Sequence, residues 1–498
     1  MRKRLFLCYL AVQAAILASA DTLHINTQSD FDAIGSRIEA AVNGGAKTVD
    51  VLLEGKTFFF KQNHIVLKNK RWNDVSISLR GNNTIITPAE RQLQDATLPS
   101  PLMQTDRLIE VVDEQSKLCR VYIGKQKVNS TANANIRITQ WFKSVTYEVV
   151  RIKGKWIYFT AHDLSYNKNY RCYNVNLDYG YSHKRAPGAE VMPRFRLEKS
   201  PMVNGQSSMV NGQSPTFNSQ FSILNSQFSI FNFLTITSSR LNSLNLSGIS
   251  FVGNASSNDG YLINIDRLHA QTIITNCKFT SIRSGVIQAL GCDSLSVTDC
   301  TFNRCYRHGI FASYSTNTTI TGNTFTQMGL DCLNSFCVRC SGKDYYIAHN
   351  TFRDFGYCGI ALGTWWQANK RTDETGVVEH NQLSYSPSYM ASWRRHSLMD
   401  SGAIYLYTQN DSVVIRHNNI HDYNGACDNR GIFCDDGASN FSIYANTIRN
   451  IPNSFCIDSR RTPNIETDER SKVRRVNLNN RIYDNDVDGT IRFEPREK

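Results

Sequence analysis

The sequence lacks any apolar stretch long enough to cross a bilayer, which takes about 20 residues. Its apolar run from Leu5 to Leu17 is too short for this, and it follows the basic residues Arg2, Lys3 and Arg4. The run ends at Ala18-Ser19-Ala20, a pattern of small residues typical of a signal-peptide cleavage site. We therefore expect residues 1–20 to be a cleaved signal peptide and the protein to be secreted or periplasmic, without membrane insertion.

Acidic residues are fewer than basic ones, 43 against 55, which gives a formal net charge of +12. No stripe of basic side chains accompanies this excess, so the sequence does not favour a nucleic-acid partner. A positive balance of this size suits an acidic partner or an anionic surface. An acidic glycan is one candidate partner, and a contribution to solubility alone is the alternative explanation.

The sequence also lacks an even set of cysteines, because 14 in the whole chain become 13 when Cys8 leaves with the signal peptide. Complete disulfide pairing within the chain is therefore excluded. Cys332, Cys337 and Cys340 have a zinc-like spacing, but no fourth ligand lies nearby. The sequence thus predicts no metal site.

A six-residue motif occurs nine times between Leu246 and Val487, with the form apolar, any, any, Asn, any, apolar. Six copies carry the asparagine, and three earlier copies replace it. The fourth positions are Ile249, Cys277, Cys300, Asn323, Asn350, Asn381, Asn418, Asn446 and Asn485. A short motif that repeats at a long and variable period is typical of a solenoid with insertions in its loops. Cys277 and Cys300 would then lie on neighbouring coils, as buried thiols or as a disulfide.

The first and last residues of the motif are mostly β-branched or aromatic, which favours strands. An asparagine between two strands suits a tight turn. Stacked asparagines can hydrogen bond from coil to coil when they are buried. From Leu234 to Phe493 the sequence resembles the right-handed parallel β-helix of the pectate-lyase type. The resemblance implies an all-β solenoid, for which we expect a monomer.

The remaining parts of the chain predict a helical cap and an insertion. Phe31 to Val42 has helical periodicity, with Ser29 and Asp30 as candidate caps, and would cover the open end of a solenoid. We assign residues 21–106 to this cap and the first coils, 107–198 to an inserted β-rich subdomain, 199–233 to a duplicated low-complexity loop, and 234–498 to the main β-helix.

Carboxylates are concentrated in the later coils, at the strands that follow the motif. Asp400 precedes one of these strands, Asp435 and Asp436 end the next, and Asp458 ends the last. Asp435 and Asp458 are expected at the same strand position on adjacent coils. Two neighbouring carboxylates suit glycoside hydrolysis, in which one protonates the leaving oxygen and the other attacks the sugar or activates water. The same residues could alternatively cap backbone amides at the corners of the solenoid.

Three pieces of this region resemble a block shared by several β-helix glycoside hydrolases. They are Asp400-Ser-Gly-Ala-Ile-Tyr405, His417-Asn-Asn-Ile-His-Asp422 and Gly431-Ile-Phe-Cys-Asp-Asp-Gly437. The resemblance implies a catalytic pair made of Asp400 with Asp435 or Asp436.

Candidate substrate contacts lie in the long loops near these carboxylates. The two indoles offer flat faces for sugar rings, and the cationic residues suit an acidic sugar. The candidates are Trp365, Trp366, Arg394, Arg395, His396, His421 and Arg460. His349, His380 and His417 share the position before the ladder asparagine, and we expect an exposed stack of rings there.

The leading hypothesis is an exported glycoside hydrolase that acts on a polysaccharide or oligosaccharide. A polysaccharide lyase acting on a uronate-containing glycan is the first alternative, and Asp400, Asp435 and Asp458 would then be Ca²⁺ ligands. A non-catalytic glycan-binding or surface solenoid is the second. As a hydrolase the protein needs no cofactor.

Overall fold

The computed structural model describes most of the solenoid and parts of the insertion. The described residues are 20–61, 63–88, 103–104, 107, 109–123, 134–140, 143–161, 164–167, 172–175, 194–199, 232–253, 260–330, 335–363, 373–387, 401–407, 409–423, 429–435, 438–452, 455–459 and 479–493. The predicted signal peptide, apart from Ala20, and the duplicated loop, apart from Lys199, Asn232 and Phe233, lie outside these ranges.

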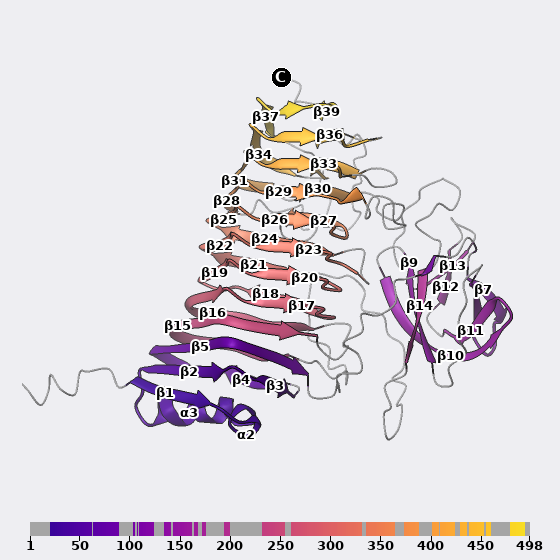
Figure 1. The fold of residues 1–498 in the computed structure, drawn as a ribbon. Coiled ribbons are helices and arrows are strands. Elements are labelled where there is room, and N and C mark those ends of the chain that lie inside the picture. The colour runs from indigo at the N-terminus through magenta and orange to yellow at the C-terminus, as the bar shows by residue number, and fades with distance from the viewer. Residues whose placement is uncertain are drawn as a thin grey trace, which may run out of the picture.

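The chain winds into a parallel β-helix in which each coil adds one strand to each of three sheets (Figure 1). The first sheet contains β18 (Gly285–Leu290), β21 (Ile310–Thr316), β24 (Phe336–Lys343), β27 (Cys358–Leu362), β30 (Ser401–Leu406), β33 (Asn429–Cys434), β36 (Phe455–Ser459) and β39 (Thr490–Phe493). The second contains β19 (Ser294–Thr298), β22 (Thr318–Thr321), β25 (Tyr345–Ala348), β28 (Thr375–Glu379), β31 (Gln409–Arg416), β34 (Ser439–Tyr444) and β37 (Arg481–Tyr483).

The third sheet consists of very short strands that follow the asparagine corner. They are β17 (Lys278–Thr280), β20 (Thr301–Asn303), β23 (Thr324–Thr326), β26 (Thr351–Arg353), β29 (Gln382–Ser384), β32 (Asn419–His421), β35 (Thr447–Arg449) and β38 (Asp486–Val487). The solenoid begins with β1 (Ala20–Ile25), β2 (Thr48–Glu54), β3 (Thr57–Phe60), β4 (Ile65–Lys68), β5 (Arg71–Pro88), β15 (Leu234–Val252) and β16 (Tyr261–Thr275). The predicted β-helix is confirmed.

The core is a stack of side chains that point inward at the same place in successive coils. Phe279, Phe302, Phe325 and Phe352 of the third sheet are buried, and neighbouring rings stack with centroids 4.4 to 4.9 Å apart. This spacing matches the distance of about 4.8 Å between paired strands. Aromatic stacking therefore fixes the register of the coils as well as burying apolar surface.

The predicted asparagine ladder forms the corner between the second and third sheets. Asn381 is fully buried, and its amide donates to Asn418 Oδ1 at 3.0 Å while its own Oδ1 accepts from Asn350 at 3.0 Å. The residue before each asparagine has a positive φ, 54° at His380, and makes the turn. Cys277 and Cys300 continue the column as buried free thiols, so the thiol alternative holds in this structure.

The N-terminal end is covered by two helices, α2 (Gln28–Asp32) and α3 (Ile34–Asn43), rather than by one continuous helix. The predicted cap at Ser29 or Asp30 is wrong by two or three residues, because Thr27 is the N-cap. Thr27 Oγ1 accepts from the Asp30 amide at 3.1 Å, and the Asp30 carboxylate accepts from the Thr27 amide at 3.2 Å. This reciprocal pair is a capping box, and it leaves Asp30 inside the first turn.

An inserted antiparallel sheet confirms the predicted β-rich subdomain. It joins β6 (Met103–Gln104), β7 (Glu110–Asp113), β8 (Leu118–Tyr122), β9 (Ala134–Gln140), β10 (Lys143–Lys153), β11 (Trp156–Thr160) and β14 (Arg194–Lys199), with β12 (Leu164–Asn167) and β13 (Cys172–Val175) paired separately. The insertion has its own buried cluster, which includes Val121, Ile138 and Phe159. Among the described residues, no helix is long and apolar enough to span a membrane.

Candidate active site on the first sheet

The outward side of the first sheet carries aromatic and charged side chains in one column, which we call the first-sheet face. Pairing of successive strands aligns Phe311, Arg339, Ala361, Tyr405, Phe433, Asp458 and Arg492. Most are buried although they point away from the solenoid core; Tyr405 is 8% exposed and Phe433 3%. A buried outward face with this composition differs from an ordinary solvated sheet surface.

Asp435 lies directly after β33, at the corner between the first and second sheets. Its amide donates to the Leu406 carbonyl at 2.8 Å, and its carbonyl accepts from the Ala438 amide at 2.9 Å. The side chain is half-buried, and its Oδ2 accepts a hydrogen bond from the Tyr405 hydroxyl. Asp435 is therefore an acidic group held in a fixed position at the edge of an aromatic surface.

Tyr405 connects Asp435 to the aromatic part of the face. Its ring packs edge-on against Phe433 at 5.4 Å and lies 5.4 Å from Tyr407 and 5.7 Å from Tyr357. These neighbours fix the ring, so the hydroxyl is presented to the carboxylate without a large loss of side-chain entropy.

Asp458 does not occupy the strand position of Asp435, so that expectation is wrong. The register places Asp458 opposite Phe433, two residues earlier along the strand than Asp435. Sequence alone did not reveal this, because two successive columns of the strand are apolar and either could have been aligned.

Asp458 is fully buried between two arginines. Its Oδ2 accepts from Arg430 Nε at 2.9 Å, and its Oδ1 accepts from Arg492 Nε at 2.8 Å, while Arg492 Nη2 donates to Oδ2 as well. The Arg430 side chain is itself only 3% exposed and stacks 3.9 Å above the Phe433 ring. A carboxylate enclosed in this way serves to hold the two guanidinium groups, rather than to exchange protons with a substrate.

A third arginine lies further along the first-sheet face. Arg339 is 8% exposed, and its guanidinium lies 4.9 Å from the Phe311 ring centroid and 5.5 Å from that of Tyr407. Sequence reasoning missed Arg339, Arg430, Arg492 and Tyr405. The one available signal was the column that Arg339, Tyr405 and Arg492 share, and this column appears only when the strand register is known.

The structure does not test the predicted pair of Asp400 with Asp435, because Asp400 lies outside the described residues. The pair therefore stays a prediction.

A comparison with protein families agrees with the architecture. The family model described as right handed beta helix region matches residues 218–372 and 261–471, which together span about half of the chain. The chain belongs to this family. A comparison with curated proteins gives no match.

Several predicted site residues of this β-helix protein lie outside the described ranges, so their positions are not part of the site as built above. They are Asp400, Asp436, Trp365, Trp366, Arg394, Arg395, His396 and Arg460. Cys332 of the rejected zinc motif also lies outside them. Cys337 and Cys340 are buried in the core, and burial raises the pKa of both thiols well above the usual value.

His421 lies on β32 of the third sheet, away from the first-sheet face. Its Nδ1 is 2.8 Å from an oxygen of Asp422, and Asn450 donates to the other oxygen at 2.6 Å. These hydrogen bonds lower the pKa of Asp422. His421 is thus paired with Asp422, and the structure does not bring it to Asp435.

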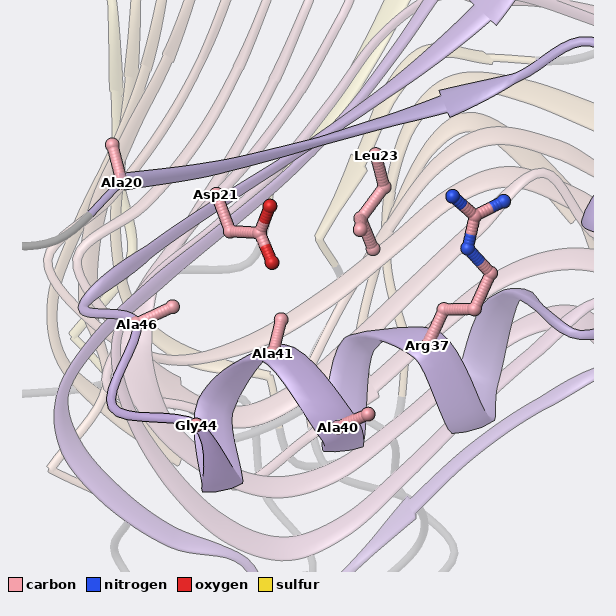
Figure 2. Close-up of a pocket in the computed structure, with 8 residues that line it drawn as sticks. All are labelled: Ala20, Asp21, Leu23, Arg37, Ala40, Ala41, Gly44 and Ala46. Carbon is pink, nitrogen blue, oxygen red and sulfur yellow. The ribbon is translucent and has the colours of Figure 1, made fainter.

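A surface hollow lies at the opposite end of the β-helix, between β1 and α3 (Figure 2). Small side chains such as Ala40, Ala41 and Ala46 line it. Its two charged residues are Asp21 and Arg37, and Arg37 already pairs with Asp30 at 2.9 Å. The hollow therefore offers no pair of catalytic groups. Within the described ranges, no three His, Cys, Asp or Glu side chains are grouped to hold a metal.

Proposed function

We propose that this β-helix protein is an exported carbohydrate-active enzyme, and that it is a glycoside hydrolase acting at the Asp435 corner. The observation that carries the proposal is the meeting of Asp435 and Tyr405 at the edge of the first-sheet face. Aromatic rings there offer flat apolar surfaces, and the adjacent carboxylate supplies the group that glycoside hydrolysis requires.

Asp435 suits the role of nucleophile or base in this mechanism. The Tyr405 hydroxyl donates a hydrogen bond to it, and a donor stabilises the ionised form of a carboxylate. The second carboxyl group would be the general acid. Asp400 and Asp436 are both candidates for it, and both lie outside the described residues.

The proposed substrate is a polysaccharide or oligosaccharide that binds at the edge of the first-sheet face beside the half-buried Asp435, and the protein would act as a monomer. The net charge of +12 supports a glycan with acidic groups. The N-terminal leader supports export, with Asp21 as the first residue after cleavage. Mass spectrometry of the exported protein would test whether its N-terminal residue is Asp21.

The lyase alternative is favoured by one specific observation, the phenol of Tyr405 on a face that also carries arginine. A phenol can transfer a proton, and an arginine can neutralise a uronate carboxylate. Calcium binding through Asp458 is not supported, since both of its oxygens accept from guanidinium groups.

The test is incubation of the wild-type protein with a panel of neutral and uronate-containing polysaccharides. A hydrolase produces new reducing ends without ultraviolet absorbance, and a lyase produces an absorbing unsaturated end. Asp435→Asn should lose activity by about 10²- to 10⁴-fold, the usual contribution of a positioned acid or base. Asp484→Asn, at an exposed corner of the second sheet, is the matched control. Full activity of Asp435→Asn would reject this site, and binding without cleavage would support the non-catalytic reading.

A further inference from the structure

The outward side of the second sheet carries a connected row of polar and aromatic side chains on strands β25 to β37. The Tyr346 hydroxyl donates to one oxygen of Glu379 at 2.9 Å, and Arg416 Nε donates to the other at 2.6 Å. Arg416 Nη1 donates to the Tyr444 hydroxyl at 3.0 Å. The Tyr444 ring stacks on Tyr483 with centroids 4.9 Å apart and an angle of 9°. Each side chain in the row is therefore held by its neighbour.

Three histidines run beside this row at the asparagine corner. The rings of His349, His380 and His417 stack with centroids 5.1 and 5.2 Å apart and angles of 4° and 8°, and all three residues are exposed. The predicted exposed stack is confirmed. Across the described part of the chain, none of the three rings makes a hydrogen bond. Gly322 and Asp484 make the same corner in other coils, so the backbone does not require a ring there.

Together these eight residues form a flat surface that we call the second-sheet face. Its members are Tyr346, Glu379, Arg416, Tyr444, Tyr483, His349, His380 and His417. Four coil intervals of about 4.8 Å give it a length of about 19 Å along the solenoid axis. Each coil adds a ring or a hydrogen-bonding group to it. Every residue of the face is described, and none belongs to the site at Asp435.

We propose that the second-sheet face binds a neutral polysaccharide chain lying along the solenoid axis. Because the rings stack on one another along the solenoid axis, they meet a ligand with their edges, where imidazole nitrogens and tyrosine hydroxyls can accept and donate hydrogen bonds to sugar hydroxyls. The charge argument favours a neutral chain, because the Arg416 guanidinium is paired with the Glu379 carboxylate. A rigid row needs little ordering when a ligand binds.

The test is affinity electrophoresis of the full protein in native gels that contain soluble xylan, mixed-linkage β-glucan or galactomannan, with polygalacturonate as the acidic probe. Two variants remove the rings. The first replaces His349, His380 and His417 by Asn, which tolerates positive φ. The second is Tyr444→Ser with Tyr483→Ser. Tyr314→Ser is the matched control, because Tyr314 is 65% exposed but lies on β21, outside the face.

We expect at least one neutral polysaccharide to retard the wild-type protein and the Tyr314→Ser control. Each ring-removing variant should weaken this retention by about tenfold or more, as the loss of stacked aromatic contacts predicts. Retention that is unchanged in both variants, or that is lost in Asp435→Asn and Tyr405→Phe instead, would overturn the proposal. Retention by polygalacturonate alone, or by none of the probes, would overturn it as well. Cleavage by the Asp435 site is measured separately, so either proposal can fail without the other.

Discussion

The outward faces of the first and second sheets share one backbone geometry and one coil spacing, yet similar side chains differ in their exposure to solvent on the two faces. On the first sheet, arginine, aspartate and tyrosine are buried, as Arg430 and Asp458 show at 2% and 0% exposure. On the second sheet, comparable groups such as Tyr483 and His380 lie in solvent. Burial strengthens electrostatic interactions and makes an unpaired charge costly. The comparison therefore predicts that substitutions on the first-sheet face affect stability far more than those on the second.

The largest effect should follow Asp458→Asn, which removes the charge between Arg430 and Arg492. Two guanidinium groups would then lose their buried partner, and breaking a buried pair costs about 3–5 kcal/mol. Urea unfolding would measure the change. Asp486→Asn is the matched control, since it breaks the exposed pair with Arg449 and should change stability little. Equal effects of the two substitutions would contradict the contrast between buried and exposed pairs.

A smaller loss is expected from Asn381→Ala in the middle of the ladder. The substitution leaves the buried backbone amide of Asn350 without its acceptor and removes one of the two donors to Asn418 Oδ1, at a cost of about 1–3 kcal/mol. Asn485→Ala at the end of the ladder is the control, because Asn485 is half-buried and water can replace its bonds. The difference between the two unfolding free energies measures how far the ladder depends on burial.

Acid should destabilise the first-sheet side through His308. Its ring stacks on Phe336 at 4.0 Å, and burial lowers its pKa to about 3, helped by the charges of Arg307 and Arg339. The unfolded chain then binds a proton that the folded chain does not. The stabilisation is complete above about pH 6.5 and falls as the pH drops toward 3, by about 1–2 kcal/mol between pH 7 and pH 5.

His308→Phe keeps the stacked ring and removes the titrating group. Its unfolding free energy should therefore fall less than that of the wild type over the same pH range. His64, whose pKa is lowered to about 4 by burial, remains in both proteins and contributes equally. An identical pH dependence in the two proteins would show that His308 is not the group responsible.

The smallest change compares two tyrosines that donate to carboxylates on the two faces. Tyr405→Phe removes the bond to Asp435, and Tyr346→Phe removes the bond to Glu379. One hydrogen bond is worth about 0.5–1.5 kcal/mol, so Tyr405→Phe should lower kcat/KM by up to about tenfold. Tyr346→Phe should leave kcat unchanged, because Tyr346 lies outside the site at Asp435 and can act only through substrate binding. Activity that falls equally in both variants would remove the functional distinction between the faces.

The sequence predicted those features that repeat in every coil. The ladder asparagines and the stacked phenylalanines recur at recognisable places, so the β-helix and its corner could be inferred from Asn323, Phe325 and their copies. The alignment of the first sheet could not, because adjacent apolar columns allow a shift. That shift misplaced Asp458 and concealed the column of Tyr405, Phe433 and Arg492. The N-cap of α2 was predicted two or three residues too late, because Thr27 and Asp30 form a reciprocal pair of hydrogen bonds that local periodicity does not reveal.

The most direct test is a crystal structure of the Asp435→Asn variant soaked with an oligosaccharide that the wild-type protein cleaves. The account predicts sugar bound at the edge of the first-sheet face, beside Tyr405, with a glycosidic oxygen within hydrogen-bond reach of residue 435. Sugar bound only on the second-sheet face, or a glycosidic bond held far from residue 435, would contradict it.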